Sequence, residues 1–113
     1  MAENSGFSDE ISPTELKTLL DKRAEIQLID VRQPEEYRFA RIPQAKLIPL
    51  DQLLDRITEL DPNREVVFYC KMGRRSKKAV EMLKAAGYKG KARSLRGGIT
   101  AWSNEVDPKV SKY

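Results

Sequence analysis

A continuous apolar run, Val66-Val67-Phe68-Tyr69, constrains the fold more than any other segment of this 113-residue chain. A strand with one face in water alternates apolar and polar residues, whereas a strand covered on both faces is apolar throughout. The run therefore predicts a buried strand of a parallel sheet. Cys70, the only cysteine, follows directly and is expected at the carboxyl end of this strand.

Helical and strand patterns alternate along the rest of the chain. Ser12, Pro13 and Glu15 match a helix start with a capping box, and this helix is expected to end near residues 21–23. Further strands are expected at 26–31, 45–48 and 92–95, and further helices at 35–39, 51–60, 76–86 and 99–105.

Two of these helices have defined ends in the sequence. Asp51 is expected to cap the 51–60 helix, which would carry on one face Leu53, Leu54, Ile57 and Leu60. Gly87 is expected to end the helix that begins at Ser76, because glycine readily adopts the left-handed conformation found after a helix. The buried side of that helix would hold Ala79, Val80, Met82, Leu83 and Ala86.

Strands that alternate with helices predict an α/β fold, with a central, mostly parallel sheet flanked by helices on both faces. The length fits one domain spanning 1–113, with a core at about 8–105 and a flexible tail at 107–113. Ligands of such sheets bind beyond the carboxyl ends of the strands, where Asp30 and Cys70 are both expected. The alternation of strands and helices alone therefore predicts a ligand-binding site near Asp30 and Cys70.

The loop Cys70-Lys71-Met72-Gly73-Arg74-Arg75-Ser76 joins a strand to a helix N-terminus, where unpaired amides favour an anion. With three cationic side chains nearby, the loop is expected to lower the thiol pKa of Cys70 and make it nucleophilic. The simpler interpretation is a core cysteine without chemistry, since free cysteines are among the most buried residues.

The composition limits the other chemistry that is available. The chain has no histidine and one cysteine, which excludes Cys-His and Ser-His-Asp nucleophile arrangements and internal disulfides. We expect no metal and no cofactor beyond a covalent intermediate on Cys70. A cytoplasmic location is the default expectation, because neither a signal peptide nor a membrane span is visible.

Positive charge is concentrated after the cysteine. Residues 1–69 hold 9 basic and 14 acidic side chains, whereas residues 70–97 hold 10 basic side chains and one acidic one. Such a patch attracts an anionic small molecule, an acidic protein or nucleic acid. Nucleic acid is the weakest of these hypotheses, because no aromatic residue is interleaved between Cys70 and Leu83 to stack on bases.

Several short motifs, taken in order, resemble the rhodanese homology domain over roughly residues 8–105. They are Asp30-Val31-Arg32, Pro34-Glu35-Glu36-Tyr37, Ile42-Pro43, the Cys70–Ser76 loop, and Leu95-Arg96-Gly97-Gly98-Ile99-Thr100-Ala101-Trp102. The resemblance is closest to the rhodanese domain of adenylyltransferases that serve sulfur-carrier proteins, and the ending Asp107-Pro108-Lys109-Val110 to Tyr113 resembles theirs too. It implies a rhodanese-like fold with a five-stranded sheet.

The resemblance implies a two-step sulfur transfer. The Cys70 thiolate would attack the outer sulfur of thiosulfate or of a donor persulfide protein, and a thiophilic acceptor would then remove sulfur from the Cys70 persulfide. The implied partners are a small anionic donor, a sulfur-carrier protein and an adenylyltransferase domain, with no membrane. Because the chain has no second cysteine, a thiol that resolves a mixed disulfide must come from elsewhere.

The resemblance also implies roles for the neighbours of Cys70. Amides from Lys71 to Ser76 would surround the persulfide, Arg75 would orient an anionic donor, and Asp30 with Arg32 would brace the loop. The alternative for Asp30 and Arg32 is a surface ion pair of little consequence. Glu36 is a weaker candidate of the same kind, and Lys77 and Lys78 are as readily a solvated helix start.

One segment departs from the family pattern. Residues 41–45 read Arg-Ile-Pro-Gln-Ala where the family usually has His-Ile-Pro-Gly-Ala, so a histidine and a turn glycine are absent.

Two other functions remain open. A non-catalytic docking module is one alternative. A phosphatase or arsenate reductase is another, but such enzymes place arginine where this chain has Ser76, and four residues between Cys70 and Arg75 predict a tighter loop.

Overall fold

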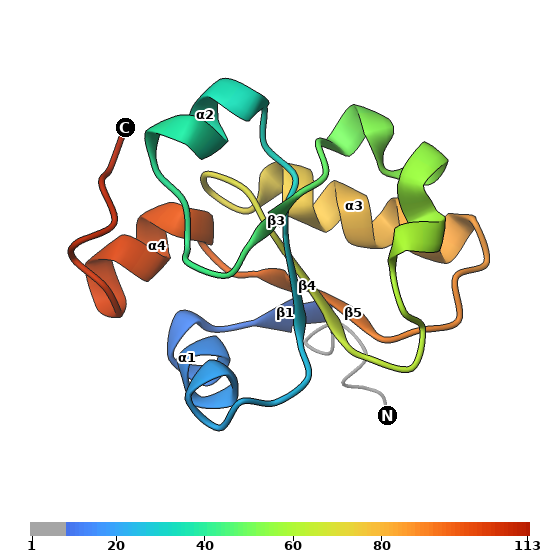
Figure 1. Cartoon of the computed structure of the whole chain (residues 1–113), viewed down its shortest axis with the longest axis horizontal. Coiled ribbons are helices and arrows are strands. Elements are labelled where there is room, and N and C mark those ends of the chain that lie inside the picture. The colour runs from blue at the N-terminus through green and yellow to red at the C-terminus, as the bar shows by residue number, and fades with distance from the viewer. Residues whose placement is uncertain (1–8) are drawn as a thin grey trace.

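The computed structural model describes residues 9–113 and has an α/β architecture (Figure 1). Its elements follow one another as β1 (Glu10–Ile11), α1 (Pro13–Asp21), β2 (Gln27–Asp30), α2 (Pro34–Phe39), β3 (Lys46–Leu47), the 3-10 helices η3 (Leu50–Gln52) and η4 (Leu54–Glu59), β4 (Val66–Tyr69), α3 (Arg74–Ala85), β5 (Ala92–Leu95) and α4 (Gly98–Glu105). The strands expected around residues 26–31, 45–48, 66–69 and 92–95 are all present.

The five strands form one parallel sheet in the order β1-β5-β4-β2-β3. β4 lies at the centre, with Val67 paired to Leu28 of β2 on one side and to Arg93 of β5 on the other. The predicted parallel α/β sheet is confirmed. The two-residue strand β1 was not located in the sequence, because a pair of residues is too short to show a period.

Successive side chains of β4 point to opposite faces of the sheet, and each face has its own core. Val67 and Tyr69 pack in a cluster with residues of α1 and α4, including Leu16 and Trp102. The opposite cluster joins α3, η3 and η4 to the sheet, and it includes Val66, Phe68, Cys70, Ala79, Val80 and Leu83. All four residues of β4 are buried, as the apolar run predicts.

Two helix boundaries bear on the site. α1 begins as expected: the Ser12 side chain accepts from the Glu15 amide, and the Glu15 side chain accepts from the Ser12 amide. α3 starts at Arg74, two positions before the predicted Ser76, with Gly73 as N-cap at φ 106°. The chain leaves α3 through Gly87 at φ 82°, as expected, but Ala86 is exposed rather than buried.

The prediction of one α-helix at residues 51–60 is wrong. The segment forms two short 3-10 helices, and Arg56 breaks the second with φ −115° and ψ 17°. Leu54, Ile57 and Leu60 are three positions apart, which is the period of a 3-10 helix as much as one face of an α-helix. Leu53 and Leu60 are buried whereas Leu54 is 49% exposed, and Asp51 makes no side-chain capping bond.

The turn that lacks the family glycine is strained. Gln44 follows Pro43 in a turn between α2 and β3 and adopts φ 78°, the left-handed region that residues with a Cβ avoid. We expect Gln44→Gly to raise the free energy of unfolding by about 0.5–1 kcal/mol, because relief of strain exceeds the added chain entropy. Urea denaturation measures this.

The matched control for that turn is Gln44→Ala, which keeps the Cβ and is expected to give no gain. Equal stability of the glycine and alanine variants would show that the turn stores no strain.

The segment expected to be flexible, residues 107–113, contacts the body of the molecule at two points. Val110 is 7% exposed in the α1–α4 core, and its carbonyl accepts a 2.7 Å hydrogen bond from the buried Ser103 hydroxyl. Further on, the Tyr113 side chain reaches residues near Cys70. Nothing in the periodicity of the segment predicts these contacts.

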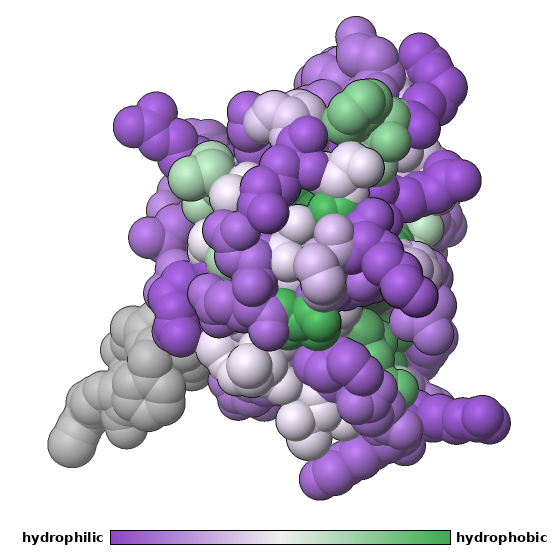
Figure 2. Space-filling view, turned by 90° about the vertical axis from the view of Figure 1, so that its left-hand side faces the viewer, coloured by the Kyte–Doolittle hydropathy of each residue, from purple (hydrophilic) through white to green (hydrophobic). Residues whose placement is uncertain are grey.

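The left-hand side of Figure 1 is mostly hydrophilic on its surface, with hydrophobic residues in small, separate areas (Figure 2). Within residues 9–113, none of the helices has the length and apolar character needed to cross a membrane.

Candidate active site

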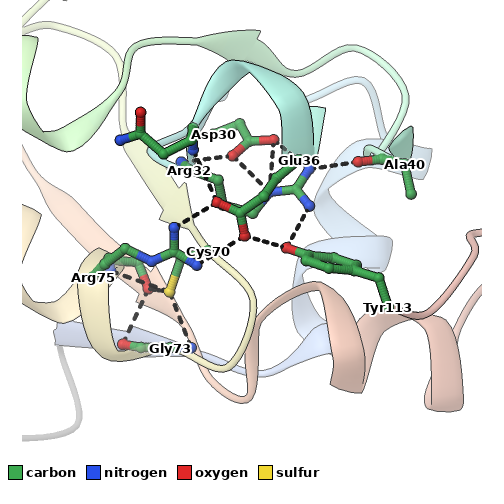
Figure 3. Close-up of polar contacts among 10 residues, drawn as sticks. Asp30, Arg32, Glu36, Ala40, Cys70, Gly73, Arg75 and Tyr113 are labelled. Carbon is green, nitrogen blue, oxygen red and sulfur yellow. Dashed lines mark hydrogen bonds and ion pairs between the residues drawn. The ribbon is translucent and has the colours of Figure 1, made fainter. Parts of the chain in front are cut away.

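Cys70 lies where the central strand ends and the basic loop begins (Figure 3). Its Sγ accepts main-chain hydrogen bonds from the Gly73 amide at 3.1 Å and the Ser76 amide at 3.4 Å. The Ser76 hydroxyl oxygen lies 3.6 Å from the same sulfur. The loop therefore curls around the sulfur, and its amides are oriented to stabilise negative charge there.

The N-terminus of α4 fixes the start of this loop. The Ile99 amide donates to the Cys70 carbonyl at 2.9 Å, and the Thr100 amide donates to the Lys71 carbonyl at 3.2 Å. These bonds require close approach at Gly98, where a Cβ would lie 2.4 Å from the Lys71 carbonyl oxygen and 2.5 Å from that of Cys70. Glycine at this position lets the start of α4 pack directly against the backbone of Cys70 and Lys71.

Cys70 is 1% exposed and belongs to the core cluster beneath α3. This burial is what the simpler interpretation, a core cysteine, would predict. The two amide donors distinguish the site from such a core position, because an apolar environment would offer no main-chain N–H groups to the sulfur.

Ser94 of β5 supports the loop from below and was missed by the sequence analysis. Its hydroxyl lies 2.7 Å from that of Ser76, which also donates to the Gly73 carbonyl at 3.2 Å. Both serines are fully or almost fully buried. A serine inside a strand carries no motif, so only the parallel pairing that places β5 beside β4 reveals its role.

Arg75 is bound by Glu36 of α2. Its Nη1 donates to Glu36 Oε1 at 2.7 Å and its Nη2 to Oε2 at 3.1 Å, a bidentate ion pair. The hydrogen bond from Arg75 lowers the pKa of Glu36 to about 2, and the Gln33 amide and the Tyr113 hydroxyl add to that effect. Glu36 thus has a larger part in the site than its weak sequence signal indicated.

The Glu36 pKa gives a pH-dependent prediction. A carboxylate whose pKa falls from 4.5 to about 2 on folding stabilises the protein above pH 4.5, and the contribution disappears as the pH falls toward 2. We expect Glu36→Gln to lower the free energy of unfolding by about 1–3 kcal/mol at neutral pH and by much less near pH 2.

Denaturant titrations at a series of pH values measure this difference. Glu35→Gln is the matched control, because Glu35 is exposed in the same turn of α2 and forms no ion pair within residues 9–113. Pairing at Glu36 would be contradicted if both variants differed from the unmutated protein by the same small amount at every pH.

Asp30 and Arg32 form a buried pair, both 0% exposed, so the alternative of a surface ion pair is wrong. Arg32 Nε donates to both Asp30 oxygens at 2.9 and 3.1 Å, and Nη2 donates to Oδ2 at 2.6 Å. Burial lowers the pKa of Arg32, but hydrogen bonds to Asp30 and Tyr113 outweigh it, so the net pKa is raised.

The buried pair braces the segment after α2 rather than the Cys70 loop itself. Arg32 Nη2 also donates to the Ala40 carbonyl, and its guanidinium lies 5.5 Å from the Tyr69 ring centroid. Within residues 9–113 neither Asp30 nor Arg32 forms a hydrogen bond to residues 70–76. Their connection to the loop runs through Tyr113.

The outer side of the loop faces solvent. Met72 is 59% exposed and Arg74 is exposed, and Arg74 has no ion-pair partner within the described part of the chain. Lys71 places its ammonium 4.7 Å from the Tyr113 ring centroid. Of the three loop cations, Arg74 alone is unengaged within residues 9–113. In the same range, no group of three acidic, cysteine or histidine side chains is arranged to hold a metal.

Comparisons with known proteins identify a family and several named relatives that the chain resembles. A family model described as "Rhodanese-like domain" matches residues 12–105. The chain is 36% identical over 103 residues to a protein named "Sulfurtransferase" from Allochromatium vinosum, covering 91% of this chain and 95% of that protein. It is 38% identical over 105 residues to the "Probable adenylyltransferase/sulfurtransferase MoeZ" of Mycobacterium tuberculosis, covering 91% of this chain but 26% of MoeZ.

A solved structure agrees with these matches. The crystal structure of a rhodanese-like domain protein from Staphylococcus aureus superposes with a TM-score of 0.78 at 34% identity, covering 93% of this chain and 98% of that one.

Proposed function

Because the chain belongs to the rhodanese-like domain family, we propose that it transfers sulfane sulfur through a persulfide on Cys70. Family membership and relatives named sulfurtransferase assign a sulfurtransferase-type role. Beyond that role, we propose Cys70 as the nucleophile, a Cys70 persulfide as the intermediate, and thiosulfate or another persulfide as the donor. A single observation carries the proposal: the sulfur of a lone cysteine accepts hydrogen bonds from two main-chain amides of a basic loop.

The first step loads sulfur onto the protein. The Cys70 thiolate attacks the outer sulfur of thiosulfate, an S–S bond forms to Sγ, and sulfite leaves with the electron pair of the broken bond. With a persulfide donor, a thiolate leaves instead. The amides of Gly73 and Ser76 stabilise the anionic thiolate before attack and the anionic persulfide after it.

The second step unloads the sulfur. A thiophilic acceptor takes the terminal sulfur, the new S–S bond breaks, and Cys70 is regenerated as a thiolate. We propose a sulfur-carrier protein as another acceptor, which reacts differently. The persulfide would attack the adenylated C-terminal carboxyl of the carrier and expel AMP, and an external thiol would then attack Cys70 Sγ, forming a mixed disulfide with Cys70 and releasing the carrier as a thiocarboxylate. The chain spans about a quarter of MoeZ, whose name joins the adenylyltransferase and sulfurtransferase activities. An adenylyltransferase domain that activates such a carrier is therefore the proposed partner.

Intact-mass spectrometry tests the loading step. After incubation with thiosulfate and desalting, we expect a mass increase of one sulfur atom, which is removed by cyanide and blocked by prior alkylation of Cys70. Thiosulfate-to-cyanide transfer then measures turnover. Protein that gains no sulfur from thiosulfate or from a small-molecule persulfide would refute the proposal.

A docking module is the second candidate function, favoured by the 1% exposure of Cys70. It predicts neither sulfur loading nor turnover, so the same experiment separates the two. A phosphatase would need an arginine at position 76. That position is a buried serine bonded to Ser94, and no observation favours phosphatase activity.

A further inference from the structure

Tyr113 joins two ion pairs that lie beside the candidate site (Figure 3). Its hydroxyl accepts a 2.7 Å hydrogen bond from Arg32 Nη1 and donates a 2.8 Å bond to Glu36 Oε2. Burial raises the pKa of Tyr113, so the phenol keeps the proton that it donates to Glu36. One hydroxyl therefore connects the buried Asp30–Arg32 pair to the Glu36–Arg75 pair.

The ring of Tyr113 makes a separate set of contacts. The Lys71 ammonium lies 4.7 Å and the Arg32 guanidinium 5.4 Å from its centroid, distances at which a cation is attracted to an aromatic face. Phe39 packs against it edge to face at 5.9 Å. Lys71 immediately follows Cys70, so the Tyr113 ring restrains a second cation of the Cys70 loop, in addition to Arg75.

These contacts reach Cys70 through both cations. Glu36 holds Arg75: the hydrogen bond to Glu36 is the main cause of the raised pKa of Arg75, and an electrostatic interaction with Cys70 makes a smaller contribution. Cations attract an anionic reagent most effectively when their positions are fixed in advance. An element that fixes both Arg75 and Lys71 thus controls how strongly the site attracts anions.

We propose that Tyr113 is a positioning residue that sets the preference of the site for anionic sulfur donors. Its hydroxyl holds the Glu36–Arg75 pair, and its ring holds Lys71. The segment 107–113 is on this account part of the site, although it contributes no atom to the ring of amides around Cys70. The consequence for donor choice rests on the proposed function, whereas the effect on anion attraction does not.

Two alkylating reagents test the effect without any sulfur transfer. Iodoacetate is anionic and iodoacetamide is neutral, and both alkylate Cys70, so the ratio of their rates reports the local potential at the sulfur. Tyr113→Phe removes the hydroxyl and keeps the ring, and we expect the ratio to fall about threefold. Tyr113→Leu also releases Lys71, and we expect a fall of about tenfold.

Tyr88→Phe is the matched control. It deletes a tyrosine hydroxyl that is buried without a hydrogen-bond partner in the described part of the chain. Its rate ratio is expected to equal that of the unmutated protein. A merely structural role for Tyr113 would change both alkylation rates equally and leave their ratio constant. An unchanged ratio in Tyr113→Phe, or an equal fall in Tyr88→Phe, overturns the proposal.

Sulfur-transfer kinetics extend the test to the donor. We expect Tyr113→Phe to raise KM for thiosulfate about threefold to tenfold while kcat stays within about twofold. If the alkylation ratio falls but no variant loads sulfur, the proposed function fails and the role of Tyr113 stands.

Discussion

Cys70→Ser protein is expected to take up no sulfur from thiosulfate and to lose at least about a thousandfold in thiosulfate-to-cyanide transfer. A serine hydroxyl keeps its proton at neutral pH, and the chain has no histidine to remove it. Serine is a better test substitution than alanine at this position, because the serine oxygen can still accept hydrogen bonds from the Gly73 and Ser76 amides. Alanine would leave those buried donors unpaired, at a cost of about 1–3 kcal/mol.

Mass spectrometry and turnover assays measure the loss, and urea denaturation provides the control. The free energy of unfolding is expected to stay within about 1 kcal/mol of the unmutated value, since the exchange is nearly isosteric. Sulfur loading that persists in Cys70→Ser protein would remove Cys70 from the mechanism.

Asp30→Asn is expected to have the largest effect on stability, lowering the free energy of unfolding by about 3–5 kcal/mol. The change removes the charge that compensates Arg32, a guanidinium that is 0% exposed. An uncompensated buried charge costs far more than the loss of an ion pair at the surface. For a domain of ordinary stability, about 5–15 kcal/mol, this is roughly a fifth or more of the total.

Asp21→Asn is the matched control, because Asp21 forms an exposed ion pair with Lys17 in α1. We expect that substitution to cost less than about 1 kcal/mol. Urea denaturation of both variants at neutral pH gives the comparison. Equal losses in the two variants would mean that the Asp30–Arg32 pair contributes no more than a surface contact.

The sequence predicts the parts of this fold that depend on local patterns. The apolar run at β4 identifies the central strand, and the capping box at Ser12 identifies the start of α1, because both signals lie within a few neighbouring residues. The 51–60 segment shows the limit of such reasoning. A spacing of three residues suits a 3-10 helix as well as an α-helix, and it does not reveal the backbone hydrogen bonds between residues three apart, such as that from the Arg56 amide to the Leu53 carbonyl.

The candidate site is predictable where the chain is continuous and unpredictable where it is assembled from distant segments. The Cys70 loop is one stretch of sequence, and the structure places Gly73 and Ser76 around the sulfur. Glu36, Ser94 and Tyr113 reach the site only after the sheet has formed. No local pattern encodes those contacts, so sequence reasoning undervalued the first and missed the other two.

The pairing of the first strand with the last one has a consequence for biosynthesis. Glu10 of β1 is in register with Ser94 of β5, so the edge strand has no partner until β5 has left the ribosome. Until then β4 has one open side, and an unpaired apolar strand invites aggregation. The side of the sheet that β5 and β1 occupy is therefore expected to close only after β5 has been synthesised.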